Sequence, residues 1–255
     1  MRLPRACAFT RPVRAAALWA LACSVLGGIT AFAQTGSTKP ALDWYGDLRL
    51  RLERDWDSQN ASGIPRDDRT RGRFRARIGA NVTIAENWSG GVRLRTGNSE
   101  SQQSPHLTFA SDPGGSDDLD GIFDKYFIQF KEGDRSFWIG RNSFPFWQQN
   151  EFFWDDDVTP TGIAARFANV GGSGNVAPTF GAFALPDGGW GLNGNLLSGQ
   201  IKYTDASAAG NGQVTVALGL HRFAGEKGAE HLLDNNGARD YLLANLGAQW
   251  LGEID

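Results

Sequence analysis

Arginine occupies every second position of the segment Arg69-Thr70-Arg71-Gly72-Arg73-Phe74-Arg75-Ala76-Arg77. Small and apolar residues stand between the arginines, and the alternation continues to residue 84. Successive side chains of a β-strand point to opposite faces, so period two predicts a strand with one charged and one apolar face. Five like charges spaced about 7 Å apart along one strand need water or counter-ions. The segment therefore predicts a strand with a wet face and an apolar face.

The segments on either side repeat this pattern. In 42–54 the even positions are mostly leucine and the odd positions are mostly charged, including Arg49 and Arg51. After a short turn at 85–88, Val92 and Leu94 alternate with Arg93 and Arg95. Three consecutive strands are therefore expected to carry arginine on the same face.

Weaker alternation continues along the chain and predicts an all-β protein of one domain. No long helical pattern follows the N-terminal region. The expected strands cover 42–54, 69–84, 89–97, 122–131, 136–142, 161–168, 176–185, 195–204, 213–223 and 239–250.

The N-terminus predicts an exported protein. Residues 1–14 contain four arginines and no acidic residue, and an apolar run follows from Ala15 to Ala33. The run ends in Ala31-Phe32-Ala33, a small-x-small pattern typical of a signal peptidase site. We therefore expect residues 1–33 to be a signal peptide and 34–255 to be the mature chain. A membrane anchor and a lipoprotein cut before Cys23 are the alternatives.

Removal of the signal peptide changes the chemistry that is available. Both cysteines, Cys7 and Cys23, lie in it, so the mature chain has no thiol chemistry. The 25 basic residues less four arginines leave 21 against 28 acidic ones, a net charge of −7. This balance argues against a nucleic-acid partner.

The connections between the expected strands alternate in length. Those after odd-numbered strands are long (55–68, 98–120, 143–160, 186–194, 224–238), and those after even-numbered strands are mostly short (85–88, 132–135, 169–175, 205–212). Outer-membrane barrels combine long external loops with short periplasmic turns. A soluble β-sandwich also alternates, but its apolar face is packed with bulky residues. Here that face often carries Gly and Ala, so a transmembrane barrel is favoured.

Several short motifs resemble those of a known family. They are Trp44-Tyr45-Gly46-Asp47-Leu48-Arg49-Leu50-Arg51, the arginine segment 69–77, Gly91-Val92-Arg93-Leu94-Arg95-Thr96-Gly97 and Ile139-Gly140-Arg141-Asn142-Ser143-Phe144-Pro145-Phe146. The chain resembles the "putative porin" family of Gram-negative outer membranes, most strongly from Trp44 to about Phe167. The resemblance implies a passive channel for small polar solutes or ions, without a cofactor or enzymatic activity. Its partners would be outer-membrane lipid and lipopolysaccharide. A structural or adhesive outer-membrane protein, or a hydrolase, is the alternative function.

Members of such families are usually longer than this chain and end in an aromatic residue. The sequence stops at Leu251-Gly252-Glu253-Ile254-Asp255, directly after an expected strand. We therefore expect an incomplete antiparallel transmembrane β-barrel of about ten strands, the N-terminal portion of a larger barrel. A complete ten-stranded barrel is the alternative.

The arginine face supplies the candidate site. The predicted pore-lining residues are Arg49, Arg51, Arg69, Arg71, Arg73, Arg75, Arg77, Arg93 and Arg95. The aromatic 143–160 loop is expected to fold inward as a constriction, with Asp155, Asp156 and Asp157 opposite the arginines. Alternatively, the loop caps the rim or contacts a neighbouring subunit of a homotrimer. A separate alternative is that the arginines pair only with Asp43, Asp47 and Glu53 or with lipopolysaccharide near the rim.

The sequence indicates no catalytic or metal-binding residue. His106 and His231 fall in expected external loops and should be solvated, whereas His221 should face the lumen. A phospholipase would need a histidine and a serine together on the lipid-facing wall, and no such pair is recognisable, although an Asp/His protease stays open. The carboxylates of the 98–120 connection do not have EF-hand spacing, so a solvated acidic loop is preferred over a calcium site. These carboxylates are Asp112, Asp117, Asp118 and Asp120.

Overall fold

The structure is a computed structural model, and it describes nine stretches of the chain. These are residues 41–60, 62–97, 105–112, 114–151, 154–167, 175–184, 195–205, 212–224 and 240–252. All of them belong to the unit Thr38–Asp255. The expected signal peptide, 1–33, lies outside the described residues.

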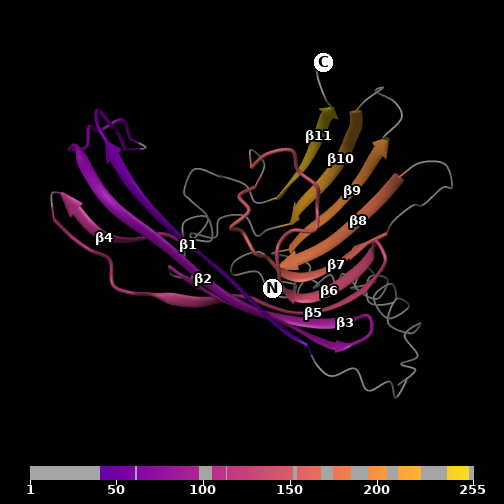
Figure 1. Cartoon of the computed structure of the whole chain (residues 1–255). Coiled ribbons are helices and arrows are strands. Elements are labelled where there is room, and N and C mark those ends of the chain that lie inside the picture. The colour runs from indigo at the N-terminus through magenta and orange to yellow at the C-terminus, as the bar shows by residue number, and fades with distance from the viewer. Residues whose placement is uncertain are drawn as a thin grey trace, which may run out of the picture. The chain divides into compact units, whose positions relative to one another are not determined.

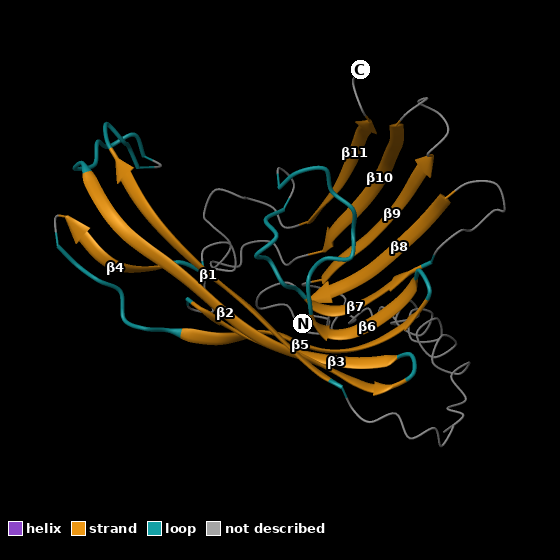
Figure 2. Cartoon of the chain, viewed as in Figure 1, coloured by secondary structure: helices purple, strands orange, loops and turns teal. Residues whose placement is uncertain are grey.

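The described stretches contain eleven strands. They are β1 (Leu42–Asp55), β2 (Arg69–Ala85), β3 (Trp88–Thr96), β4 (Leu107–Asp112), β5 (Gly121–Glu132), β6 (Arg135–Arg141), β7 (Thr161–Arg166), β8 (Asn175–Ala184), β9 (Asn195–Asp205), β10 (Gly212–Ala224) and β11 (Asp240–Gly252). The ten expected strands are confirmed, each with ends within two residues of the prediction. Figure 2 shows the described chain as strands joined by loops.

The strands form one antiparallel sheet in chain order. The order is β1-β2-β3-β5-β6-β7-β8-β9-β10-β11, and β4 pairs with β2 off this path (Figure 1). The sheet is not closed, so the all-β antiparallel fold and the incomplete barrel architecture are confirmed. No helix in the described stretches is long and apolar enough to cross a bilayer.

One face of this sheet, the apolar face, is exposed on strand after strand. Leu50 of β1 is 68% exposed, Ile78 of β2 is 56% exposed, and Leu246 of β11 is 74% exposed. The opposite face, the polar face, carries Arg93 and His221, which are 7% and 0% exposed. Soluble monomers rarely expose apolar patches of this extent. The apolar face is therefore exposed and the polar face is partly buried, the reverse of the arrangement in a soluble β-sandwich.

The strand β4 was not predicted, because its residues fall in the expected 98–120 connection. It pairs with β2 from Phe74↔Leu107 to Thr70↔Asp112. In contrast, β3 pairs with β2 only from Arg77 onward, so β4 takes over the edge of β2 where β3 has ended. Six residues inside a polar stretch are too few for period two to be recognised.

A register shift interrupts the alternation of faces along β5. Opposite Arg93 and Leu94, β5 carries one extra residue, and both Asp124 and Lys125 make contacts on the polar face. A β-bulge of this kind interrupts the alternation of faces. On β6 the even position Trp138 is buried at 4% exposure, whereas Ile139 is 47% exposed on the apolar face.

Two adjacent residues test the assignment of the faces. We expect Leu50→Cys to react with a lipid-soluble maleimide and Arg49→Cys to react with a charged, water-soluble one. Their positions are consecutive in β1, so the two variants are matched for depth. The reverse pattern would show a slip of one residue, because such a slip exchanges the faces.

Candidate functional site

The arginines of β2 lie in a ladder of ion pairs rather than in a uniformly basic patch. Asp55 contacts Arg69 at 2.9 Å and Arg71 at 3.2 Å. Glu53 contacts Arg71 at 2.9 Å and Arg73 at 3.4 Å. Each of these two carboxylates therefore bridges two successive arginines of β2, as expected from the pairing of the strands.

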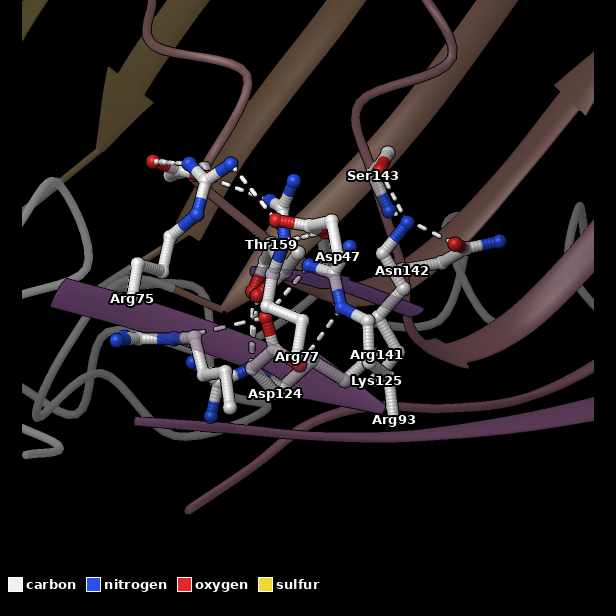
Figure 3. Close-up of polar contacts among 12 residues, drawn as sticks. Asp47, Arg75, Arg77, Arg93, Asp124, Lys125, Arg141, Asn142, Ser143 and Thr159 are labelled. Carbon is white, nitrogen blue, oxygen red and sulfur yellow. Dashed lines mark hydrogen bonds and ion pairs between the residues drawn. The ribbon is translucent and has the colours of Figure 1, made fainter. Parts of the chain in front are cut away.

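The 143–160 loop supplies the next rung of the ladder. Asp157 of this loop lies 2.9 Å from a nitrogen of Arg75 and 2.7 Å from a nitrogen of Arg77. Asp47 of β1 contacts the same two arginines at 3.0 and 2.5 Å (Figure 3). Two carboxylates, one from β1 and one from the loop, thus hold one pair of guanidinium groups.

The three aspartates of the loop have different roles. Asp157 is 9% exposed and contacts Arg75 and Arg77 directly. It therefore does not lie across a constriction from the arginines, which was the expectation from the sequence. Asp155 accepts a hydrogen bond from the backbone N–H of Asp157, 2.8 Å away. The exposed Asp156 accepts one from the side chain of Gln148, also at 2.8 Å. The expected constriction residues therefore do not form one acidic row.

A second and more deeply buried ion pair lies on β3 and β5. Asp124 is fully buried and accepts two bonds from Arg93, from Nε at 2.9 Å and from Nη2 at 2.6 Å. Arg95 lies 3.5 Å from the same carboxylate and is 2% exposed. Two parallel bonds from one guanidinium give both strength and fixed geometry.

The 143–160 loop lies on the polar face and is anchored at several points. The backbone N–H and C=O of Trp147 bond to the side-chain amide of Gln200 on β9, each at 2.8 Å. Phe144 stacks on Trp154 at 4.2 Å between ring centroids and meets Phe183 of β8 edge-on at 5.1 Å. The loop thus closes a small apolar core against the sheet.

A polar trio lies beneath the same loop. His221 of β10 has Nδ1 3.0 Å from Ser198 Oγ and Nε2 3.1 Å from Asn245 Oδ1. The rings of Phe146 and Trp154 meet the imidazole edge-on. His221 was expected to face the lumen, and it lies buried on the polar face. The sequence gave no sign of this trio. It faces away from the exposed apolar wall on which a phospholipase site would lie.

His106 is not solvated, contrary to expectation. It is 8% exposed, and Arg73 donates to its backbone oxygen at 2.8 Å. Burial, with Arg51 and Arg73 nearby, lowers the pKa of His106 to about 4. The imidazole is therefore neutral at neutral pH. His231 lies outside the described residues.

The acidic 98–120 connection behaves as a structural loop where it is described. Asp117 accepts a hydrogen bond from the backbone N–H of Thr108 at 2.6 Å, which fixes the loop to β4. Within the described stretches, no three His, Cys, Asp or Glu side chains are placed to hold a metal ion.

Positive charge exceeds negative charge in the contacts of the polar face. We call these side chains the basic network. Its cations are Arg51, Arg69, Arg71, Arg73, Arg75, Arg77, Arg93, Arg95, Lys125 and Arg141, and its carboxylates are Asp47, Glu53, Asp55, Asp124 and Asp157. Ten cations against five carboxylates leave an excess of five positive charges. Arg49, which is exposed and lies across from Arg75, adds one more.

The chain forms an antiparallel sheet with an exposed apolar face and a charged face, and a loop lies on the charged face. This arrangement is typical of porin-like β-sheet proteins. The family model described as "putative porin" matches residues 57–206. The chain belongs to this family. Comparison with the curated proteins gave no significant match.

The link between Asp157 and the ladder predicts how firmly the loop is held. Asp157→Asn removes two charge-assisted contacts, each worth roughly 1.5–3 kcal/mol. We therefore expect faster cleavage of the 143–160 loop in limited proteolysis of the native protein. The neighbouring exposed carboxylate provides the control, since Asp156→Asn should cleave at the wild-type rate. Equal rates for both variants would show that the ion pairs do not hold the loop.

Proposed function

We propose that the protein is an outer-membrane porin that lets small hydrophilic solutes diffuse passively, with the polar face as the lumen wall. The observation that carries the proposal is the inverted sheet of a chain in the porin family. Its apolar face is exposed across the strands, and its charged face is partly covered by an inserted loop.

The apolar face supports contact with lipid. Side chains such as Leu48 and Leu220, 67% and 51% exposed, would be costly in water but suit acyl chains. Backbone groups within a bilayer need internal partners, which antiparallel pairing supplies strand by strand. Outer-membrane lipid and lipopolysaccharide are therefore the proposed partners. Residues 1–33 are the proposed signal for export across the inner membrane of a Gram-negative bacterium.

The basic network supports a preference for anions. Charged groups that line a pore set its ion selectivity. The mature chain carries a net charge of −7, yet the network has an excess of five positive charges. Ions in the lumen would respond to the nearby wall, because charges more than about 8–10 Å away are screened at physiological salt.

The proposal is tested with the native protein in liposomes and planar bilayers. Small neutral sugars should enter protein-containing liposomes at a rate that falls with sugar size, and the bilayers should show discrete conductance steps. Liposomes prepared with heat-denatured protein are the control. Intact liposome barriers and a silent bilayer, with folded protein present, would exclude a diffusion channel and favour a structural or adhesive role.

A further inference from the structure

Lys125 is a cation of the polar face that the arginine pattern did not reveal. It lies in the β-bulge of β5, beside Asp124 and across from Arg93. Its Nζ donates to Ser143 Oγ at 2.7 Å, at the start of the 143–160 loop (Figure 3). The ammonium group therefore lies where the loop leaves the sheet.

Arg141, at the end of β6, is the second cation at this point. Its cross-strand partner is Tyr126, the neighbour of Lys125. Gly140 precedes it with φ of 123°, a conformation that glycine adopts readily and other residues rarely adopt. Arg141 Nε donates to the backbone oxygen of Thr159 at 3.0 Å and to its hydroxyl at 3.3 Å.

These two cations differ from their neighbours in the oxygens that they contact. Arg93 and Arg77 bind the carboxylates of Asp124 and Asp157. In contrast, the oxygens that Lys125 and Arg141 bind within the described stretches are neutral hydroxyl and carbonyl groups. A partly buried charge is stabilised by an opposite charge. The neighbouring carboxylate, Asp124, attracts Lys125 but makes its direct ion-pair contacts with Arg93 and Arg95. The two cations at the ends of the 143–160 loop can therefore attract an additional anion.

We propose that Lys125, Arg141 and the Ser143 hydroxyl form a binding subsite for the oxyanion group of a permeating solute, a carboxylate or a phosphate. This inference rests on the proposed function and names the solute class of that channel. The two cations supply N–H donors, and the Ser143 hydroxyl can rotate and donate its own O–H to the solute while its oxygen accepts from Lys125. An oxyanion would pause here during passage along the basic network.

The test measures block of chloride current by added anions. Inorganic phosphate and acetate are added separately to the native channel in a planar bilayer, and their half-blocking concentrations are determined. We expect at least one of them to block, and Lys125→Gln and Arg141→Gln each to raise its half-blocking concentration about tenfold, the loss typical of one charged hydrogen bond. Which anion blocks distinguishes a phosphate from a carboxylate solute. Lys131→Gln, an exposed lysine on the same strand, should leave the value unchanged.

A second readout does not depend on current. The same anion should raise the unfolding temperature of the detergent-solubilised wild type, because a ligand that binds only the folded state stabilises it. The shift should be smaller in Lys125→Gln. An open channel with neither block nor thermal shift, or with shifts unaltered by both variants, would overturn the subsite and leave the porin function intact. A protein that never conducts, yet shows the thermal shift, would overturn the porin function instead.

Discussion

Asp124→Asn is expected to prevent stable folding of the sheet. The carboxylate is fully buried and is shared by Arg93 and Arg95, which are 7% and 2% exposed. Removal of one partner from a buried ion pair typically costs about 3–5 kcal/mol, because the remaining charge loses its compensation. In this network two guanidinium groups would be left, so the upper part of that range applies. Heat-modifiability in gel electrophoresis measures the loss, as the temperature at which the compact band disappears.

Two further variants separate charge compensation from local packing. Asp120→Asn removes an exposed carboxylate from the connection before β5, and its transition temperature should stay at the wild-type value. The triple variant Asp124→Leu, Arg93→Met, Arg95→Met replaces the whole buried set by apolar residues, which is often tolerated. It should regain much of the stability. A stable Asp124→Asn would show that the buried set does not hold β3 to β5.

The second large effect concerns ion selectivity. Replacing Arg71, Arg73 and Arg75 by Gln removes three positive charges from consecutive rungs of the ladder. One unit charge about 4 Å from an ion in water is worth about 1 kcal/mol, or roughly a fivefold change in local ion concentration. We therefore expect the anion-to-cation permeability ratio to fall at least severalfold, and the reversal potential in a salt gradient to move toward cations.

The control has the same change of charge at other places. Arg54, Arg66 and Arg135 are exposed and lie outside the basic network, so their joint replacement by Gln should leave the reversal potential nearly unchanged. If both triple variants shift it equally, total charge determines selectivity and the ladder does not. If neither shifts it, the ladder lies outside the permeation path.

Most of the strands could be predicted from the alternation of polar and apolar residues, because the two faces of this sheet differ sharply in polarity. The segment 69–84 predicted β2 almost to the residue. Strict alternation places successive side chains on opposite faces, so a β-bulge, which breaks the alternation, cannot be predicted from it. Asp124 and Lys125 were missed for that reason, although both make contacts on the polar face.

The candidate site was less predictable than the strands. The alternative interpretation named Asp43, Asp47 and Glu53 as partners of the arginines, and Asp47 and Glu53 make such contacts. Asp157 reaches the same ladder from about 80 residues away, and no local pattern encodes that contact. The trio around His221 likewise joins three strands through tertiary packing. The sequence thus identified the arginines of the polar face but not the carboxylates that compensate their charges from distant parts of the chain.

The reversal potential of the native protein tests the central claim most directly. The claim is that the polar face lines a water-filled pore whose basic network favours anions. The protein extracted from outer membranes is reconstituted in a planar bilayer between two potassium chloride solutions of different concentration. We expect discrete conductance steps and a reversal potential of the sign that chloride preference gives. Discrete steps with potassium preference would contradict the role of the basic network, and the absence of any steps from folded protein would contradict the channel itself.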